Sequence, residues 1–357
     1  MRFTSLPGAI GGRSRKTLLA ATGTVAVLAA GTIGYSAYAD AGDFQAGISY
    51  VDGGVPWGDS AAMDSATEVL SGISPLQNQH IIGFGADELW PDPNSDERDW
   101  SSLDERIEWI KQTGGTPVIT LCSAPGWMKP SGDTWEMDEA PLPEYFDEYA
   151  QLSAEVADRY SDDVQYFQVW NEFKGFWDGS DLKYAEYTDF YNQVYNAVRD
   201  VNPDAKLGGP YVSLRTAING SAEQPSDLKG DWGEVDGRDL EAIEYWMDNK
   251  AGADFFTVDG WSIDEDGNAL DVDGIQSMYT DITEWMVAHA DGLPVWWSEF
   301  YAPLSGTPKE PGESSPEAMT AALTGMSDGG THAMTERVAE ATKLAANTLS
   351  LARGQAR

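Results

Sequence analysis

The sequence predicts an α/β fold, a (β/α)8 TIM barrel whose eighth strand is incomplete or atypical. Apolar runs alternate with amphipathic helical segments through most of the 357-residue chain, a rhythm typical of parallel strands joined by helical crossovers. No glycine-rich phosphate loop follows any of these runs, which disfavours an open, doubly wound sheet. No Pro/Gly/Ser-rich linker divides residues 40–357, and barrels of roughly 250 residues or more are routinely single domains.

The apolar runs predict seven strands, each short and bounded by turn residues. These strands are Ala46–Val51, His80–Ala86, Thr116–Ala124, Val164–Trp170, Ala205–Pro210, Asp254–Ser262 and Leu293–Phe300. A closed barrel needs an eighth strand, and the one candidate is the short run Thr331–Met334.

Segments with apolar residues at helical spacing follow the strands and predict seven helices. These helices are Ala61–Ser71, Ser102–Gln112, Glu144–Tyr160, Lys183–Val201, Asp239–Asn249, Gly274–Ala290 and Pro316–Asp328. Gly114-Gly115 and Asn202-Pro203 predict helix ends, because glycine closes a helix and the residue before proline avoids helical dihedrals. The loop at 216–238 is long for a compact domain, and such loops are usually functional or disordered.

Residues 1–39 differ from the rest of the chain. They contain basic but no acidic residues, then an apolar run at 17–34, and end in the small-residue site Ala37-Tyr38-Ala39. This pattern predicts a signal peptide cleaved after Ala39, and hence a secreted protein with no stable membrane association after cleavage. The alternative is an uncleaved membrane anchor. Arg13-Ser14-Arg15-Lys16 is not a strict twin arginine, so either export system remains open.

The chain is strongly acidic, with 59 Asp and Glu against 22 Lys and Arg and a net charge of −37. Such a surface repels phosphate backbones, which argues against a nucleic-acid partner. We favour solubility as the role of this charge, in a medium whose salt screens it.

Cysteine and histidine give no sign of a metal or a nucleophilic triad. The single cysteine, Cys122, lies in an apolar run and is predicted to be a buried small side chain. His80, His289 and His332 are scattered without metal-ligand spacing. The sequence therefore predicts neither a metal site nor a cofactor.

Two glutamates stand at the ends of predicted strands. The fourth strand ends in Trp170-Asn171-Glu172 and the seventh in Trp297-Ser298-Glu299. Functional residues of a parallel barrel lie at the carboxyl ends of its strands, so both carboxylates should emerge on one face. Hydrolysis of a glycosidic bond needs two carboxyl groups flanking that bond. A lone glutamate at a strand end would more often be a surface residue, but the pair together indicates this chemistry.

The segments Phe167–Phe173 and Val295–Phe300 resemble the acid/base and nucleophile motifs of the clan A retaining glycoside hydrolases. Within that clan the chain is most similar to glycoside hydrolase family 39, the β-xylosidase and α-L-iduronidase group. The segment Trp170–Pro210 carries much of the likeness, which extends over about 46–301. The resemblance implies a TIM barrel acting on an oligo- or polysaccharide by double displacement.

The resemblance also implies individual roles. Glu172 would be the acid/base, Glu299 the nucleophile, and Asn171 a ligand of the sugar 2-hydroxyl. Strand alternation points Asn171 and Glu172 to opposite faces, so both reach one pocket only if the strand ends in a bend. Members of the clan commonly have a basic residue or histidine at the ends of early strands, and this residue is missing where the second strand is predicted to end. The sixth strand carries Asp259-Gly260-Trp261 where a histidine or tyrosine would be expected. Aromatic rings at or just past strand ends are candidate sugar-binding residues: Trp127, Trp177, Trp261, Trp297 and Tyr301.

Two alternatives stay open. The chain could be an endo-acting polysaccharide hydrolase of the same clan, with its long loops forming a cleft instead of a pocket. It could also be a non-catalytic carbohydrate-binding barrel, inactive because the final strand is missing. Release of reducing sugar separates catalysis from binding, and product length separates exo from endo action.

Overall fold

The computed structural model describes residues 47–49, 59–73, 76–84, 86–178, 181–218, 220–264, 267–303 and 316–330. The predicted signal peptide at 1–39 and the candidate eighth strand Thr331–Met334 both lie outside these residues. Among the described residues, no helix combines the length and the apolar character that a membrane span requires.

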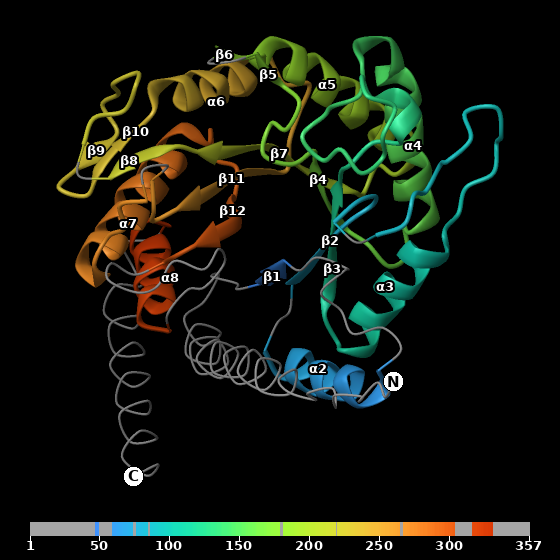
Figure 1. The fold of residues 1–357 in the computed structure, drawn as a ribbon, viewed down its shortest axis with the longest axis horizontal. Helices are drawn as coiled ribbons and strands as arrows, with labels where there is room; N and C mark the ends of the chain where they lie inside the picture. Colours follow the sequence, from blue (N-terminus) through green and yellow to red (C-terminus); the bar gives the residue numbers. More distant parts are fainter. Residues whose placement is uncertain are drawn as a thin grey trace, which may run out of the picture.

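Seven parallel strands form a nearly closed barrel with helices around its outside (Figure 1). In sheet order the strands are β1 (Gly47–Ser49), β2 (Leu76–His80), β3 (Thr116–Leu121), β4 (Tyr166–Val169), β7 (Lys206–Leu214), β11 (Phe255–Trp261) and β12 (Val295–Tyr301). The order follows the chain, as right-handed βα units predict. The two edge strands approach each other at their carboxyl ends, where the Ser49 hydroxyl reaches the Glu299 carboxyl.

The predicted helices are confirmed, with small changes at their ends. They are α2 (Ser60–Ile73), α3 (Ser101–Gln112), α4 (Phe146–Arg159), α5 (Tyr184–Val201), α6 (Gly237–Asn249), α7 (Val272–His289) and α8 (Pro316–Gly330). Gly114 follows α3 with a φ of +74°, and Asn202 caps α5, as the glycine and proline signals predicted. Asp236 and Asp271 cap α6 and α7 by accepting hydrogen bonds from backbone N–H groups.

The second strand lies earlier in the chain than the sequence predicted. We expected His80–Ala86, but β2 spans Leu76–His80, whose residues after Leu76 are all polar and all buried. The apolar run that follows, Ile81-Ile82, is a buried bend whose backbone N–H groups donate to the carbonyls of Thr120 and Cys122. The prediction was wrong because it assumed apolar strands, whereas the inside of this barrel is partly polar. As a result, the second strand ends in a histidine, His80, at the mouth of the barrel.

The polar interior is a hydrogen-bonded layer that crosses the barrel. Asn78 on β2 accepts a hydrogen bond from Thr120 on β3 at 2.8 Å, and Gln168 on β4 donates to Thr120 at 3.1 Å. The side chain of Gln168 also contacts Ser298 on β12, which in turn contacts Thr257 on β11. Buried polar groups are stable only when they are paired in this way. The layer thus links the strands that carry Glu172 and Glu299.

The long loop after β7 is ordered. Of the two expectations for 216–238, a functional or a disordered loop, the structure disfavours disorder in the described residues: they form a three-stranded antiparallel sheet with β8 (Thr216–Ile218), β9 (Lys229–Gly230) and β10 (Gly233–Val235). Trp232 anchors it: the ring is 2% exposed and its Nε1 donates to Asp281 on α7 at 2.7 Å. This small sheet therefore lies outside the barrel strands and packs against α7 (Figure 1).

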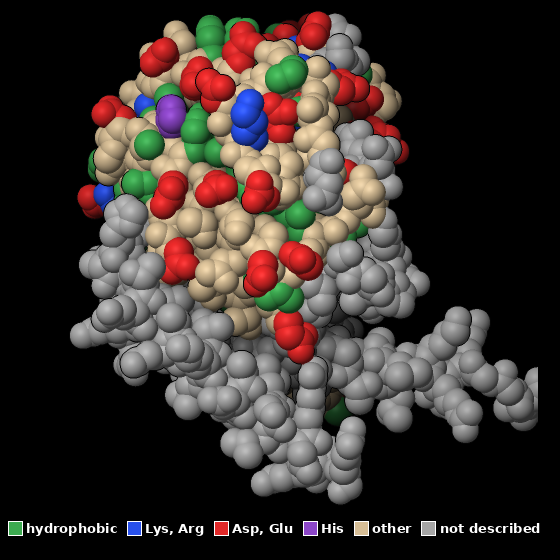
Figure 2. Space-filling view, turned by 90° about the vertical axis from the view of Figure 1, so that its left-hand side faces the viewer, with side chains coloured by type: hydrophobic (Ala, Val, Ile, Leu, Met, Phe, Trp, Pro, Cys, Tyr) green, Lys and Arg blue, Asp and Glu red, His purple; other side chains and the backbone are tan. Residues whose placement is uncertain are grey.

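Figure 2 shows the face of the molecule that carries α7 and the small sheet, with many acidic side chains and few basic ones across it. This distribution agrees with the net charge of the sequence. Cys122 is fully buried at the end of β3, as predicted, and burial raises the pKa of its thiol to about 12. It is therefore an inert core residue.

Candidate active site

The chain bends sharply after β4, and the bend brings Asn171 and Glu172 to the same side. Trp170, Glu172 and Phe173 have φ angles of +67°, +53° and +57°. Residues other than glycine adopt this conformation at a cost of order 1–3 kcal/mol each. Because of the bend, the Asn171 amide donates to the Glu172 carboxyl at 3.1 Å. Strict alternation along a strand would have separated these two side chains.

Packing holds this strained loop in place. Trp170 is fully buried, and its Nε1 donates to the carbonyl of Lys174 at 2.7 Å. Phe173 stacks on Tyr187 of α5 with ring centroids 4.1 Å apart. The Tyr187 hydroxyl donates to the Val169 carbonyl at 2.9 Å. The loop that presents Glu172 is thus fixed before any ligand arrives.

Two irregularities in the strands aim Tyr211 and Glu299 into the same space. Between β7 and β11, Pro210 pairs with Thr257 and Val212 with Val258, so Tyr211 is an extra residue with a φ of +55°. Between β11 and β12, Trp297 pairs with Val258 and Glu299 with Asp259, so Ser298 is extra. Such bulges commonly re-aim side chains near active sites.

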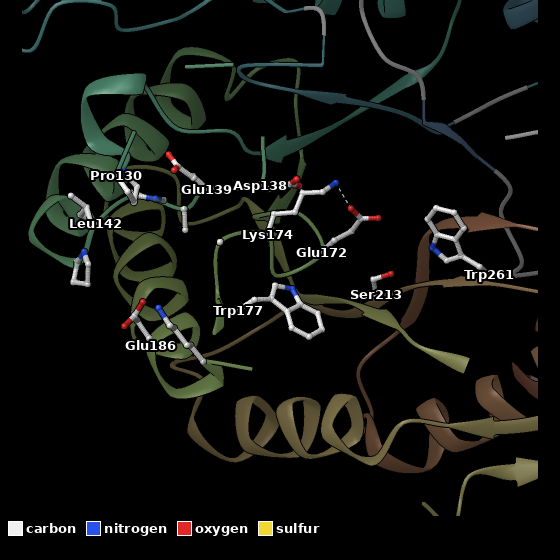
Figure 3. Close-up of a pocket in the computed structure, with 15 residues that line it drawn as sticks. Pro130, Asp138, Glu139, Leu142, Glu172, Lys174, Trp177, Glu186, Ser213 and Trp261 are labelled. Atoms are coloured by element: carbon white, nitrogen blue, oxygen red, sulfur yellow. Dashed lines mark ion pairs between the residues drawn. The ribbon is translucent and has the colours of Figure 1, made fainter. Parts of the chain in front are cut away.

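The site therefore contains three carboxyl groups. Glu172, Asp259 and Glu299 each place one carboxylate oxygen within 4.8 Å of the others. Glu172 is ion-paired with Lys174 (Figure 3). Tyr211 donates a hydrogen bond to Glu299 at 3.1 Å. Among the described residues, these three carboxylates are the group that could hold a cation. The spacing of the three residues in the sequence did not predict this cluster. Lys174 already supplies positive charge at this point.

The environment shifts the pKa values of Glu172 and Glu299 in opposite directions. Burial alone would raise the pKa of Glu172, but a hydrogen bond from Asp259 and the Lys174 ammonium outweigh it, so the pKa is lowered. Burial and the charge of Glu172 raise the pKa of Glu299, against smaller opposing effects of Tyr211, Lys174 and Ser49. The charge of Glu172 therefore also influences the ionisation of Glu299.

His80 connects the second strand to this site. Its ring Nε2 lies 3.4 Å from the side-chain oxygen of Asn171. Burial lowers the pKa of His80 to about 4, so the ring is neutral near pH 7. A neutral ring can donate from Nε2 to Asn171, which orients the amide toward Glu172. The sequence did not suggest this role, because the second strand was predicted to begin at His80, whereas it ends there.

A cleft of about 650 Å³ opens from Glu172 along the mouth of the barrel. Glu172, Lys174, Ser213, Trp177 and Trp261 surround its inner part (Figure 3). Its outer part is lined by three prolines and by acidic and basic side chains: Pro130, Pro141, Pro143, Asp138, Glu139, Lys183 and Glu186. The cleft has the size of a typical ligand site.

The predicted aromatic residues divide into two groups. Trp177 and Trp261 line the cleft, and Tyr301 packs against Trp261 with ring centroids 4.9 Å apart. Trp127 and Trp297 do not line it. Trp127 packs edge-on between Trp90 and Tyr145, and the Nε1 of Trp297 donates to Thr283 on α7 at 3.0 Å. For these two rings the structure favours a packing role: Trp297 precedes the bulge, and strand alternation turns it away from the barrel interior that Ser298 faces.

No protein-family model matches the chain, and no curated protein matches it in sequence. Solved structures do match. A monomeric β-xylosidase from Caulobacter crescentus CB15 is 20% identical with a TM-score of 0.51, over 75% of this chain and 53% of that one. A family 39 β-xylosidase from Caulobacter crescentus is 18% identical with a TM-score of 0.53, over 80% and 59%.

The chain thus spans little more than half the length of either enzyme. At this level of identity the likeness concerns the fold. The strand order, the helical crossovers and these matches together identify the structure as a TIM barrel similar to that of the family 39 β-xylosidases.

Proposed function

We propose that the chain is a retaining O-glycoside hydrolase with xylosidase-like specificity. The observation that carries the proposal is the approach of Glu172 and Glu299 to within 4.8 Å between carboxylate oxygens, from strands on opposite sides of the barrel mouth. Retaining glycosidases hold their carboxyl groups about 5–5.5 Å apart, whereas inverting ones need about 6.5–9.5 Å to admit a water molecule. The short separation supports double displacement.

In the proposed reaction Glu299 attacks the anomeric carbon and forms a glycosyl ester. The bond to the leaving oxygen breaks, and Glu172 gives its proton to that oxygen. In the second step Glu172 takes a proton from water, the water oxygen attacks the anomeric carbon, and Glu299 leaves. Trp177 and Trp261 offer ring faces at the cleft against which the C–H face of a sugar can pack.

The test is a panel of 4-nitrophenyl glycosides and of oligo- and polysaccharides, with proton NMR of the first product formed. We expect turnover with retention of the anomeric configuration. An inverted product would exclude double displacement. No turnover of any substrate, together with measurable binding, would favour a non-catalytic carbohydrate-binding barrel.

An endo-acting hydrolase is the second candidate, and the length of the cleft supports it. The cleft continues from Glu172 past Trp177 to Pro130 and Glu186, which is more room than one sugar ring needs. Product length decides the question: single sugars indicate exo action, and a ladder of oligosaccharides indicates endo action.

The protonation of the site predicts how Lys174 affects pH dependence. The reactive form needs Glu172 protonated and Glu299 ionised, yet the pKa of Glu172 is lowered and that of Glu299 raised. The acid limb of kcat/KM then follows Glu172 and the alkaline limb follows Glu299. Lys174→Met removes the ammonium that contacts Glu172. We expect the acid limb to move to higher pH.

The pH profile of kcat/KM on a 4-nitrophenyl glycoside measures this shift. Lys111→Met is the control, because this lysine pairs with Asp163 on the outside of the barrel. An acid limb that stays in place in Lys174→Met would mean that the ion pair does not control the protonation of Glu172.

We also propose that the protein acts outside the cell, because residues 1–39 have the pattern of a signal peptide. N-terminal sequencing of protein recovered from the medium checks cleavage after Ala39. Recovery of the uncleaved chain from membranes alone would indicate an anchor.

A further inference from the structure

Asp259 is a third carboxyl in the site, and its place in the sheet sets it between the other groups. In the strand register it lies beside Ser213 of β7 on one side and Glu299 of β12 on the other. It is fully buried, with 0% exposure. Neither of its oxygens makes a hydrogen bond of ordinary geometry among the described residues, although the Ser213 hydroxyl lies near enough to stabilise the charged form. A buried carboxylate in this state would be costly.

The groups that face Asp259 explain how the cost is avoided. The Ser213 hydroxyl stabilises the charged form less than burial and the two glutamates oppose it, and Tyr279 directs its hydroxyl to the carbonyls of Gly260 and Tyr301. The carboxyl of Glu172 lies beside Asp259, with one oxygen of each group within 4.8 Å of the other, and a hydrogen bond between the two groups lowers the pKa of Glu172 and raises that of Asp259. Two ionised carboxylates can only accept hydrogen bonds, so this contact is favourable only when a proton lies between them.

The surroundings decide which of the two carries that proton. Glu172 faces the Lys174 ammonium, which stabilises its charged form. Asp259 faces Glu299 and Glu172, and Tyr211 and Tyr301 lie near them as neutral hydroxyls. Burial, followed by the contact with Glu172, raises the pKa of Asp259 well above its ordinary value. The proton therefore resides on Asp259.

We propose that Asp259 is a positioning residue for the catalytic pair: its carboxyl stays protonated at neutral pH and donates a hydrogen bond that holds the Glu172 carboxylate facing Glu299. Lys174 and Asp259 together then fix the orientation of Glu172. The catalytic part of this inference rests on the proposed function. The protonation of Asp259 does not, and it can be tested on a protein that shows no activity.

Infrared difference spectroscopy of the full chain at neutral pH tests the protonation. Subtracting the spectrum of Asp259→Asn from that of the wild type should reveal the C=O band of a carboxylic acid. Asp99→Asn is the control: hydrogen bonds from Ser101 lower the pKa of this exposed group, so only a carboxylate band should be lost. An aspartate-specific 13C label in the unsubstituted chain gives the same answer without any variant. No protonated aspartate in either experiment would overturn the proposal.

Kinetics of two variants test the positioning role, with a 4-nitrophenyl glycoside that the wild type hydrolyses. Asparagine keeps a neutral N–H donor, so Asp259→Asn should retain most of kcat/KM and an unchanged pH profile. Asp259→Ala loses the hydrogen bond to a charged group, for which we expect a loss of about 10- to 100-fold and an acid limb at higher pH. Full activity in Asp259→Ala, or equal loss in both folded variants, would contradict the role. If the wild type hydrolyses none of the glycosides, the proposed function is contradicted. The infrared test of Asp259 protonation remains valid, because it does not depend on activity.

Discussion

Glu299→Gln is expected to abolish turnover of ordinary glycosides, with a loss in kcat/KM of at least about 10⁴-fold. The amide nitrogen and oxygen cannot form the glycosyl ester. In the proposed reaction neither neighbouring carboxyl replaces Glu299, because Glu172 is assigned to the leaving group and Asp259 is fully buried. The fold should be preserved, since glutamine has nearly the same shape and can still accept the hydrogen bond from Tyr211.

Two measurements check this expectation. Initial rates over the 4-nitrophenyl panel give the loss, and Glu108→Gln serves as a charge-matched control on the exposed face of α3. A 2-deoxy-2-fluoro glycoside should leave a covalent sugar on the wild type, and peptide mass analysis should find it on Glu299. A label on another residue, or turnover by the glutamine variant near the wild-type rate, would remove Glu299 from the role of nucleophile.

Glu172→Ala should have an effect that depends on the leaving group. For glycosides with poor leaving groups, we expect a loss of about 10²- to 10⁴-fold, because the leaving oxygen then departs without a proton. For aryl glycosides with good leaving groups, formation of the glycosyl ester should be almost unaffected, because these oxygens need little acid assistance. The ester should then accumulate, since no base remains to activate water.

Pre-steady-state rates with a series of aryl glycosides measure this dependence, and Glu244→Ala on the exposed face of α6 is the control. Added azide should rescue turnover of Glu172→Ala, since it attacks the ester without a base, and the glycosyl azide should keep the anomeric configuration of the substrate. Equal loss across the whole aryl series would contradict the acid/base role.

The repeating pattern of the chain was enough to predict the fold. Six of the seven expected strands lie where the apolar runs placed them, and the barrel order follows from the rhythm of strand and helix. The second strand was misplaced, because Gln77-Asn78-Gln79-His80 contains no apolar residue, and strands were predicted from apolar runs. Its polar residues satisfy one another only after the barrel has closed, which no local pattern can reveal.

The meeting of Glu172 and Glu299 could be predicted from their places at strand ends. Their neighbours could not. Tyr211 enters the site through an extra residue in β7, and Lys174 through a loop with left-handed dihedrals, neither of which has a signature in the residue order. Asp259 was visible as the end of the sixth strand, but its role depends on a contact with Glu172 that joins distant parts of the chain.

Contacts with other parts of the chain also divide the predicted aromatic residues. Trp177 and Trp261 keep free surface toward the cleft, whereas the rings of Trp127 and Trp297 are already engaged by their neighbours. Sequence position at or past a strand end could not separate these cases. The packing of Trp127, in the turn Gly126–Met128, depends on rings from other segments, and the direction of Trp297 depends on which face of β12 meets the helices.

Gln168 connects the two strands that carry the glutamates. It lies on β4, four positions before Glu172, and its amide oxygen is hydrogen-bonded to the hydroxyl of Ser298 on β12, the residue next to Glu299. The separation of Glu172 and Glu299 therefore depends in part on a buried amide beneath them. If the two glutamates react as proposed, a substitution at Gln168 could change their spacing while every residue that lines the cleft stays the same.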